Sequence, residues 1–190
     1  MSGTTGQPEF REVWRGRGDP PVSVETATVA HAGHGWEQTR MRVGNGRGGV
    51  VVVAVRGGQI ALVRLWRPSV DATRLELPRG LCESDRPEDD AARELREETG
   101  FEPRSVHHLG DFEVDTSLLP TSVHAFQAEI EEDAEPVETD GEVDRVVWTD
   151  VEELPSLLSN GELRDAISLA AVALWRSSVT GERSAGRRET

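Results

Sequence analysis

The pattern of hydrophobic positions predicts a chain that is rich in β-strands. Residues 50–55, five valines and one alanine, are typical of a strand that is buried on both faces. Gly57-Gly58 predicts a hairpin turn into a second apolar strand, which begins at Ile60. The other strand-like segments are residues 11–17, 22–31, 36–43, 75–77, 104–114, 121–130 and 143–148.

Three segments carry helical signals. Residues 87–99 begin with Pro87 and three acidic side chains, which suit a helix N-terminus, and they stop at Gly100. Residues 162–176 place apolar side chains on one stripe, and residues 150–154 predict a short helix. Many strands with few helices predict an α+β fold, specifically an α/β/α sandwich built on a mixed β-sheet.

The same pattern divides the chain into four parts. Residues 1–9 are rich in Gly, Ser, Thr and Pro, and we expect them to be disordered. Residues 10–45 are expected to form an antiparallel β-rich extension, which is a possible dimerisation element. Residues 46–176 form the main domain, and residues 177–190 are expected to be a polar C-terminal tail.

Composition excludes several classes of protein. Among 190 residues, 35 are acidic and 21 are basic, all of them Arg, which gives a net charge of −14 and argues against a general nucleic-acid binder. No apolar stretch approaches the ~20 residues of a membrane span, and the N-terminus does not resemble a signal peptide. The single Cys82 can form neither an internal disulfide nor a thiolate zinc site. We therefore expect a cytoplasmic protein without a nucleic-acid or membrane partner.

Three carboxylates are the candidate chemical feature of the helix at residues 87–99. Glu94, Glu97 and Glu98 stand at i, i+3 and i+4, so they spread over about a third of its circumference. Such like charges are tolerated when they are solvated or when a divalent cation lies among them. All-oxygen ligation suits Mg²⁺ or Mn²⁺ rather than Zn²⁺. Taken alone, a glutamate-rich helical face is more typical of a solvated surface.

The residues around these carboxylates resemble the Nudix box, G-x5-E-x7-R-E-U-x-E-E-x-G-U with U apolar. RELREETGF, from Arg93 to Phe101, matches its second half. The first half departs, because Asp85 stands in place of Glu. Gly80 lies thirteen rather than fourteen residues before Arg93, and Arg79 holds the glycine position, so the loop is one residue short. In the family the early acidic residue braces this loop, so Asp85 is expected to pair with Arg93.

The resemblance implies a Mg²⁺- or Mn²⁺-dependent hydrolase. It implies that water cleaves the pyrophosphate of a nucleoside diphosphate that is linked to another moiety. Glu94 and Glu98 are the expected metal ligands, with Glu97 close behind as a metal or catalytic group. The backbone carbonyl of Arg79 is a further candidate ligand. The residues with an expected structural role in the box are Gly80, Asp85, Arg93 and Gly100.

The resemblance also implies a general base outside the box. In many members it comes from a later loop that closes over the site, and the acidic residues 138–142 occupy that place. Glu142 is the first candidate, followed by Glu138 and Asp140. An ordinary solvated acidic loop is an equally good interpretation for any one of them.

Beyond the box, the layout of residues 10–176 is similar to ADP-ribose pyrophosphatases and related nucleotide-sugar hydrolases. Members of that group are commonly homodimers whose N-terminal strands help to form the substrate site. By this resemblance, Trp14 or Trp36 could stack on adenine and Arg67 could contact a phosphate. The simpler interpretations are ordinary core or interface aromatics and a surface charge.

Other functions are compatible with the same residues. They are a Nudix hydrolase for another nucleotide class, an ADP-ribose sensor that controls transcription, and a non-catalytic nucleotide-binding or scaffold domain. A sensor of this kind carries a DNA-binding domain, for which 14 polar residues after the last helix are too few. The five histidines are expected to be structural. His107 and His108 would point to opposite faces of a strand, so they form no chelating pair.

Overall fold

The computed structural model describes residues 7–137, 139, 141 and 143–185. Most of the stretch expected to be disordered, residues 1–6 of 1–9, lies outside this range. By their contacts the residues form two units, one of residues 1–48 and 113–122, the other of residues 49–112 and 123–190. No feature of the sequence indicated that residues 113–122 belong to the first unit.

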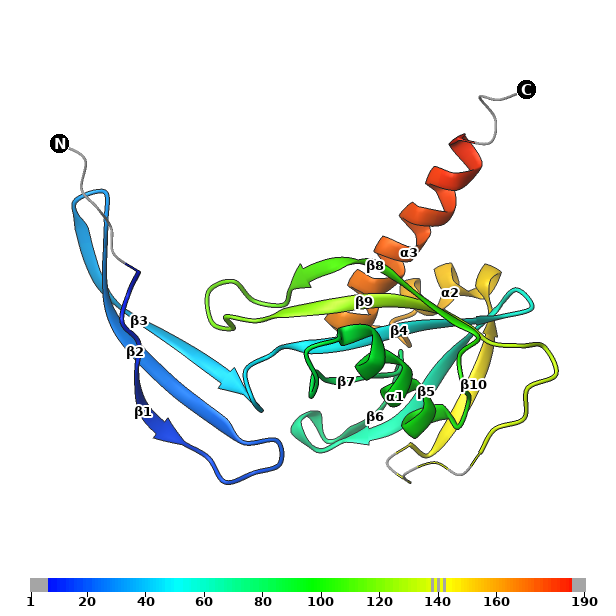
Figure 1. Ribbon diagram of the computed structural model, residues 1–190, viewed down its shortest axis with the longest axis horizontal. Coiled ribbons are helices and arrows are strands. Elements are labelled where there is room, and N and C mark those ends of the chain that lie inside the picture. The colour runs from blue at the N-terminus through cyan, green and yellow to red at the C-terminus, as the bar shows by residue number, and fades with distance from the viewer. Residues whose placement is uncertain (1–6, 138, 140, 142, 186–190) are drawn as a thin grey trace. The chain divides into compact units, whose positions relative to one another are not determined.

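The first unit is a three-stranded antiparallel sheet. Its strands are β1 (Arg11–Arg15), β2 (Val22–His31) and β3 (His34–Val43), in the order β1-β2-β3 (Figure 1). Residues 113–122 are joined to β3, because Leu118 O accepts a hydrogen bond from Met41 N at 2.8 Å and Ser117 O accepts one from the Gln38 side chain at 2.8 Å. The expected N-terminal antiparallel extension is thus confirmed.

The second unit contains a seven-stranded mixed sheet. Five strands follow the order β10-β5-β4-β9-β8, while β6 pairs with β5 and β7 pairs with β4 (Figure 1). The pairing of β4 with β9 is parallel. The strands are β4 (Gly49–Arg56), β5 (Gln59–Arg67), β6 (Ala72–Glu76), β7 (Arg79–Leu81), β8 (Ser105–Glu113), β9 (Ser122–Glu129) and β10 (Arg145–Asp150).

The two strands of the central hairpin diverge soon after their turn. β4 and β5 pair only at Val55↔Ile60 and Arg56↔Gln59. Beyond that point β6 takes the edge of β5, and β7 takes the edge of β4. Between β6 and β7 the chain turns at Leu77-Pro78, and Pro78 O accepts a hydrogen bond from Val52 N at 2.9 Å. The sequence did not predict β7, because Pro78 and Gly80 are typical strand breakers.

Helices cover both faces of this sheet. They are α1 (Pro87–Thr99), α2 (Leu154–Ser159) and α3 (Ala166–Ala185), with 3₁₀ turns at Pro68–Val70 and Val151–Glu153. On β4, Val50 and Val52 share a core with Leu95 of α1, whereas Val51 and Val53 share a core with Trp175 of α3. The predicted α/β/α sandwich with a mixed sheet is therefore confirmed.

The C-terminal helix differs from its prediction at both ends. It was expected over residues 162–176, but α3 begins at Ala166 and continues to Ala185, into the stretch expected to be a polar tail. Its start follows from a side-chain cap, because Asp165 accepts a hydrogen bond from Ser168 N at 3.0 Å. Among the described residues, no helix has the length and apolar character needed to cross a membrane.

Candidate active site

Helix α1 places two of its carboxylates against strand β7. The Glu98 carboxylate accepts a hydrogen bond from Arg79 N at 3.0 Å. The Glu94 carboxylate lies beside Gly80, where a Cβ atom would stand only 2.0 Å from it. A side chain at position 80 would therefore displace Glu94, which explains the glycine. Two carboxylates one helical turn apart thus converge on the Arg79-Gly80 segment.

Burial makes these carboxylates unusually hard to ionise. Glu98 is only 5% exposed, and burial raises its pKa to about 8, although the hydrogen bond from Arg79 N opposes the shift. Burial also raises the pKa of Glu94, opposed mainly by the charge of Arg93. Among the described ion pairs none includes Glu98. A bound cation would supply the missing positive charge.

A buried charge cluster lies next to Glu98. Glu76 is 2% exposed, and it pairs with Arg67 at 2.7 Å and with Arg79 at 2.8 Å. Burial alone would raise the pKa of Glu76, but the hydrogen bond from Arg67 and the charges of both guanidinium groups hold it below the ordinary value. Two arginines against one carboxylate leave a net positive charge. Such a charge would favour a phosphate group. The contact of Arg67 with a phosphate stays a prediction.

Arg93 holds the glutamates of α1 and the preceding loop together. Its guanidinium pairs with Glu94 at 2.8 Å and with Glu97 at 2.7 Å, and it donates to Leu81 O at 3.1 Å. It also lies 4.0 Å from Glu83 in the loop. Glu97 is thus engaged by Arg93 and lies more in solvent than Glu94. The expected pairing of Arg93 with Asp85 stays a prediction.

A second set of contacts, those of Asp90, holds the loop before α1, and the sequence did not predict them. Asp90, which is buried, accepts hydrogen bonds from Ser84 N at 3.1 Å and from Ser84 Oγ at 3.0 Å. It also lies 3.6 Å from Arg93. From the sequence, Asp90 is one of three acidic residues that favour a helix N-terminus. Ser84, six residues before Asp90, is the one sequence signal of this hydrogen-bonded contact. The sequence analysis missed Glu76 too, although an acidic residue between Leu75 and Leu77 was a visible anomaly.

The expected general base lies in a segment that is only partly described. Glu138, Asp140 and Glu142 are outside the described residues. Both flanks of the segment are attached to the second unit. Val137 N donates to Gly100 O at 2.8 Å, and Asp144 N donates to Arg64 O at 2.9 Å.

Gly100 has a structural role that the sequence predicted only in part. It ends α1 with a φ of 76°, as a C-terminal glycine should. In addition, a Cβ atom at this position would lie 2.4 Å from Val137 O. Gly100 therefore lets the segment that leads to residue 138 pack against the end of α1.

The two tryptophans expected to bind adenine lie in the first unit. Trp14 on β1 is 56% exposed, and Trp36 on β3 is 45% exposed. Neither is a core aromatic in the described chain. Trp36 Nε1 donates to the Gln38 side chain at 3.1 Å.

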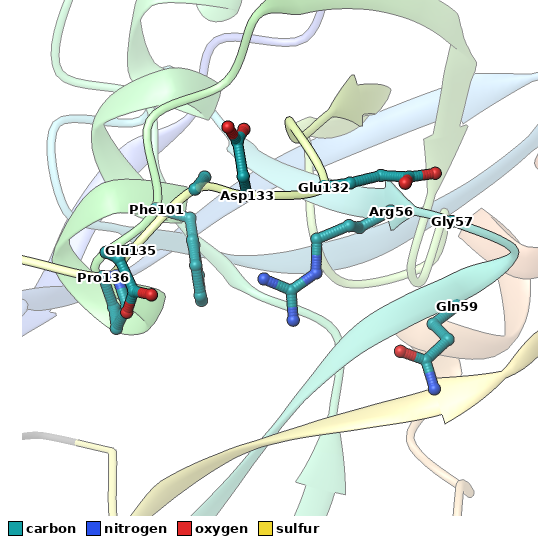
Figure 2. A pocket seen from close by; sticks show the side chains of 9 residues that line it. Arg56, Gly57, Gln59, Phe101, Glu132, Asp133, Glu135 and Pro136 are labelled. Atoms are coloured by element: carbon teal, nitrogen blue, oxygen red, sulfur yellow. The ribbon is translucent and has the colours of Figure 1, made fainter.

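A pocket of about 580 Å³ lies away from the carboxylates. Arg56 stands over the ring of Trp148 at 3.8 Å. Glu132, Asp133 and Glu135 also line this pocket (Figure 2). Arg56 is the last residue of β4, whereas Val50, near the other end, pairs with Gly80. The acidic loop would repel a diphosphate. This pocket is therefore a poorer candidate than the carboxylate site.

The donors at α1 and β7 fit a hard divalent cation. Glu94 and Glu98 offer carboxylate oxygens from one helix, and burial raises the pKa of both, a shift that a bound cation would oppose. Oxygen donors of this kind suit Mg²⁺ or Mn²⁺. A cation held there, together with the net charge of Arg67, Arg79 and Glu76, would allow an acidic protein to hold a polyanionic substrate.

Comparisons with known proteins identify relatives of this chain. The family model described as NUDIX domain matches residues 46–171. An ADP-ribose pyrophosphatase of Bacillus subtilis (strain 168) is 31% identical over 130 residues, which make up 66% of this chain and 70% of that protein. A GDP-mannose pyrophosphatase of Yersinia enterocolitica serotype O:8 / biotype 1B is 28% identical over 141 residues, covering 68% of this chain and 73% of that protein.

A solved structure described as an ADP compounds hydrolase has the same fold. It superposes with a TM-score of 0.77 at 21% sequence identity, and the match covers 95% of this chain and 98% of that one.

The buried Glu98 carboxyl predicts a pH dependence of stability. In protein stripped of divalent cations, the raised pKa favours the folded state while Glu98 is protonated. That contribution is complete below about pH 4.5 and declines until the pH passes about 8. Glu98→Gln keeps a neutral side chain, so at pH 9 we expect it to be more stable than the wild type by roughly 2–4 kcal/mol. Urea unfolding at pH 5 and pH 9 measures this difference.

Glu88→Gln is the matched control, because Glu88 is an exposed carboxylate of the same helix. We expect this variant to follow the wild type at both pH values. Equal pH profiles for all three proteins would contradict the burial of an ionisable carboxylate at position 98.

Proposed function

Because this chain belongs to the NUDIX family, we propose that it is a Mg²⁺-dependent pyrophosphohydrolase of ADP-ribose or a related nucleotide sugar. The observation that carries the proposal is the convergence of the Glu94 and Glu98 carboxylates on Arg79-Gly80. The names of the two curated relatives, an ADP-ribose and a GDP-mannose pyrophosphatase, support a nucleoside diphosphate sugar as substrate. A cytoplasmic location stays a prediction from the sequence.

In this proposal Glu94 and Glu98 hold the cation. Mg²⁺, when bound, neutralises diphosphate charge and lowers the pKa of a bound water. Arg67 and Arg79 orient the diphosphate by charge, while Glu76 fixes both guanidinium groups in place. The oxygen of a water molecule forms a new bond to one phosphorus, and the bond from that phosphorus to the bridging oxygen breaks. Two phosphomonoesters leave, which for ADP-ribose are AMP and ribose 5-phosphate.

A general base completes the proposal. A carboxylate among Glu138, Asp140 and Glu142, with Glu142 as the first candidate, accepts the proton of the attacking water. The contacts of Val137 and Asp144 support this assignment, since they attach both flanks of the segment to the domain that carries the carboxylate site.

We also propose that the protein is a homodimer that uses the first unit. A three-stranded sheet alone buries little apolar surface, and this one leaves Val13, Trp14 and Trp36 exposed. Covering these side chains with a second copy would remove them from water. Stacking on a nucleobase would be a further use of one tryptophan.

Activity assays test the function directly. With Mg²⁺ we expect turnover of ADP-ribose, and a panel with GDP-mannose, other nucleotide sugars, dinucleoside polyphosphates, NADH and oxidised dGTP ranks the substrates. Glu94→Gln and Glu98→Gln should each lower kcat/KM at least about 100-fold, because each removes a charged ligand. Glu88→Gln should match the wild type. Absence of turnover of the whole panel with Mg²⁺ and with Mn²⁺ would favour the scaffold alternative.

Substitutions in the acidic segment identify the base. Glu142→Gln is expected to lower kcat by about 10²–10⁴-fold while the Mg²⁺ dependence and the KM stay close to those of the wild type. Glu138→Gln and Asp140→Asn serve as parallel variants. If Glu142→Gln keeps full kcat and one of the other two loses it, the base is reassigned, and if none loses it, the base lies outside this segment.

Sedimentation equilibrium tests the dimer. We expect the mass of two chains for the wild type and a shift toward one chain for Trp14→Asp. Trp66→Asp is the control, because Trp66 is equally exposed at 55% but belongs to the second unit. A raised KM without a change in mass in Trp36→Ala would assign that side chain to the nucleobase. A monomeric wild type would refute the dimer.

A further inference from the structure

A cluster of two imidazoles and one carboxylate lies on strands β8 and β9. His108 Nε2 lies 2.7 Å from Asp111 Oδ1, and His124 Nδ1 lies 2.8 Å from the same oxygen. No two of these three atoms are more than 4.8 Å apart. We propose that His108, Asp111 and His124 bind a divalent transition-metal ion of the Zn²⁺ class, at a site separate from the carboxylates of α1.

Two members of this cluster, His108 and Asp111, lie on strand β8. In a regular strand, residues 108 and 111 would point to opposite faces. Asp111 nevertheless contacts His108, and Gly110 between them adopts a φ of 149°, which departs from a regular strand. The ring of His108 also packs against Phe126, with the ring centroids 5.3 Å apart. His108 and Asp111 are therefore close together before any ion binds.

The donor set selects the ion. Two imidazole nitrogens and one carboxylate oxygen are donors that suit Zn²⁺, Co²⁺ or Ni²⁺, whereas Mg²⁺ prefers oxygen alone. Zn²⁺ lies about 2.0–2.1 Å from imidazole nitrogen, so its tetrahedral ligands stand about 3.3 Å apart. Asp111 Oδ1 lies 2.7 Å and 2.8 Å from the two imidazole nitrogens, and all three atoms lie within 4.8 Å of one another, so side-chain rotation would be needed to reach that spacing.

Exposure of the cluster leaves room for further ligands. The side chains of His108 and Asp111 are about half exposed, and that of His124 is about a quarter exposed. To bind the ion, His108 Nε2 and His124 Nδ1 must carry no proton. In a neutral imidazole the proton can instead sit on the other ring nitrogen. Water or another small ligand can then occupy the remaining coordination positions of the ion.

Strand register places this cluster on the same face of the sheet as α1. His124 pairs with Val50 on β4, and Val50 pairs with Gly80 on β7. Two strand spacings of 4.7–4.9 Å put the backbones of His124 and Gly80 about 10 Å apart. Glu94 and Glu98 are not members of the histidine cluster. We therefore treat the two sites as separate, and the Glu98→Gln variant below tests that separation.

Zinc titration of the untagged full-length chain tests the site. The protein is stripped of metal, placed in excess Mg²⁺ to occupy oxygen-only sites, and titrated with Zn²⁺ against a chromophoric chelator. We expect one Zn²⁺ per chain, bound at least about tenfold more weakly by His108→Ala and by His124→Ala. His107→Ala is the matched control, because the neighbouring histidine lies outside the cluster, and it should bind like the wild type.

Two further measurements keep the result unambiguous. Co²⁺ should give visible absorption bands in the wild type and in Glu98→Gln but not in His108→Ala or His124→Ala, while circular dichroism shows that each variant is folded. Equal Zn²⁺ affinity in the wild type and the two histidine variants would overturn the proposal. Loss of the Zn²⁺ site in His107→Ala or in Glu98→Gln would overturn it as well. The readout is binding, so it is independent of the proposed hydrolysis.

Discussion

The divergence of β4 from β5 is the constraint on which the candidate site depends. The two strands share a hairpin end and then separate, so each exposes an edge of unpaired backbone groups. Strands β6 and β7 satisfy those edges, and the Leu77-Pro78 corner lies between them. Leu77 N donates to Ser168 Oγ at 2.8 Å, which ties the corner to α3. This arrangement brings a loop-like segment into the middle of the sheet, where Arg79 and Gly80 meet α1.

Burial of several carboxylates beside the Arg79-Gly80 segment makes their ionised forms costly unless positive charge lies nearby. Glu76, Glu94 and Glu98 all lie at or near the interior, where an isolated carboxylate is costly. Glu76 pairs with two arginines, whereas Glu98 accepts a hydrogen bond from Arg79 N and has no ion pair among the described residues. The protein thus keeps one carboxylate ionised and leaves its neighbour with a pKa of about 8. A divalent cation bound at Glu98 would stabilise its ionised carboxylate. The burial that makes an ionised Glu98 costly without a cation therefore favours binding of one.

The sequence predicted the fold and the helix that carries Glu94 and Glu98, because both follow from local patterns. Residues 87–99 carry their own start and stop signals, and the valine run at residues 50–55 can only be a buried strand or a buried helix segment. Strand β7, Glu76 and the His108 cluster were missed because each depends on pairing across the sheet. Asp111 contacts His108 on the same strand, with Gly110 at a positive φ between them. No periodicity in the sequence predicts that contact.

The short box loop shows which part of the motif is a physical requirement. A glycine is needed where the Glu94 carboxylate lies against β7, since a Cβ atom at position 80 would stand 2.0 Å from it. Gly80 meets this requirement although it stands one residue nearer to Arg93 than the family pattern has it. Between Leu81 and Arg86, Ser84 N donates to Asp90 and Leu81 O accepts from Arg93, so contacts with α1 hold this shorter loop. The position of the glycine is therefore explained by the carboxylate that lies over it.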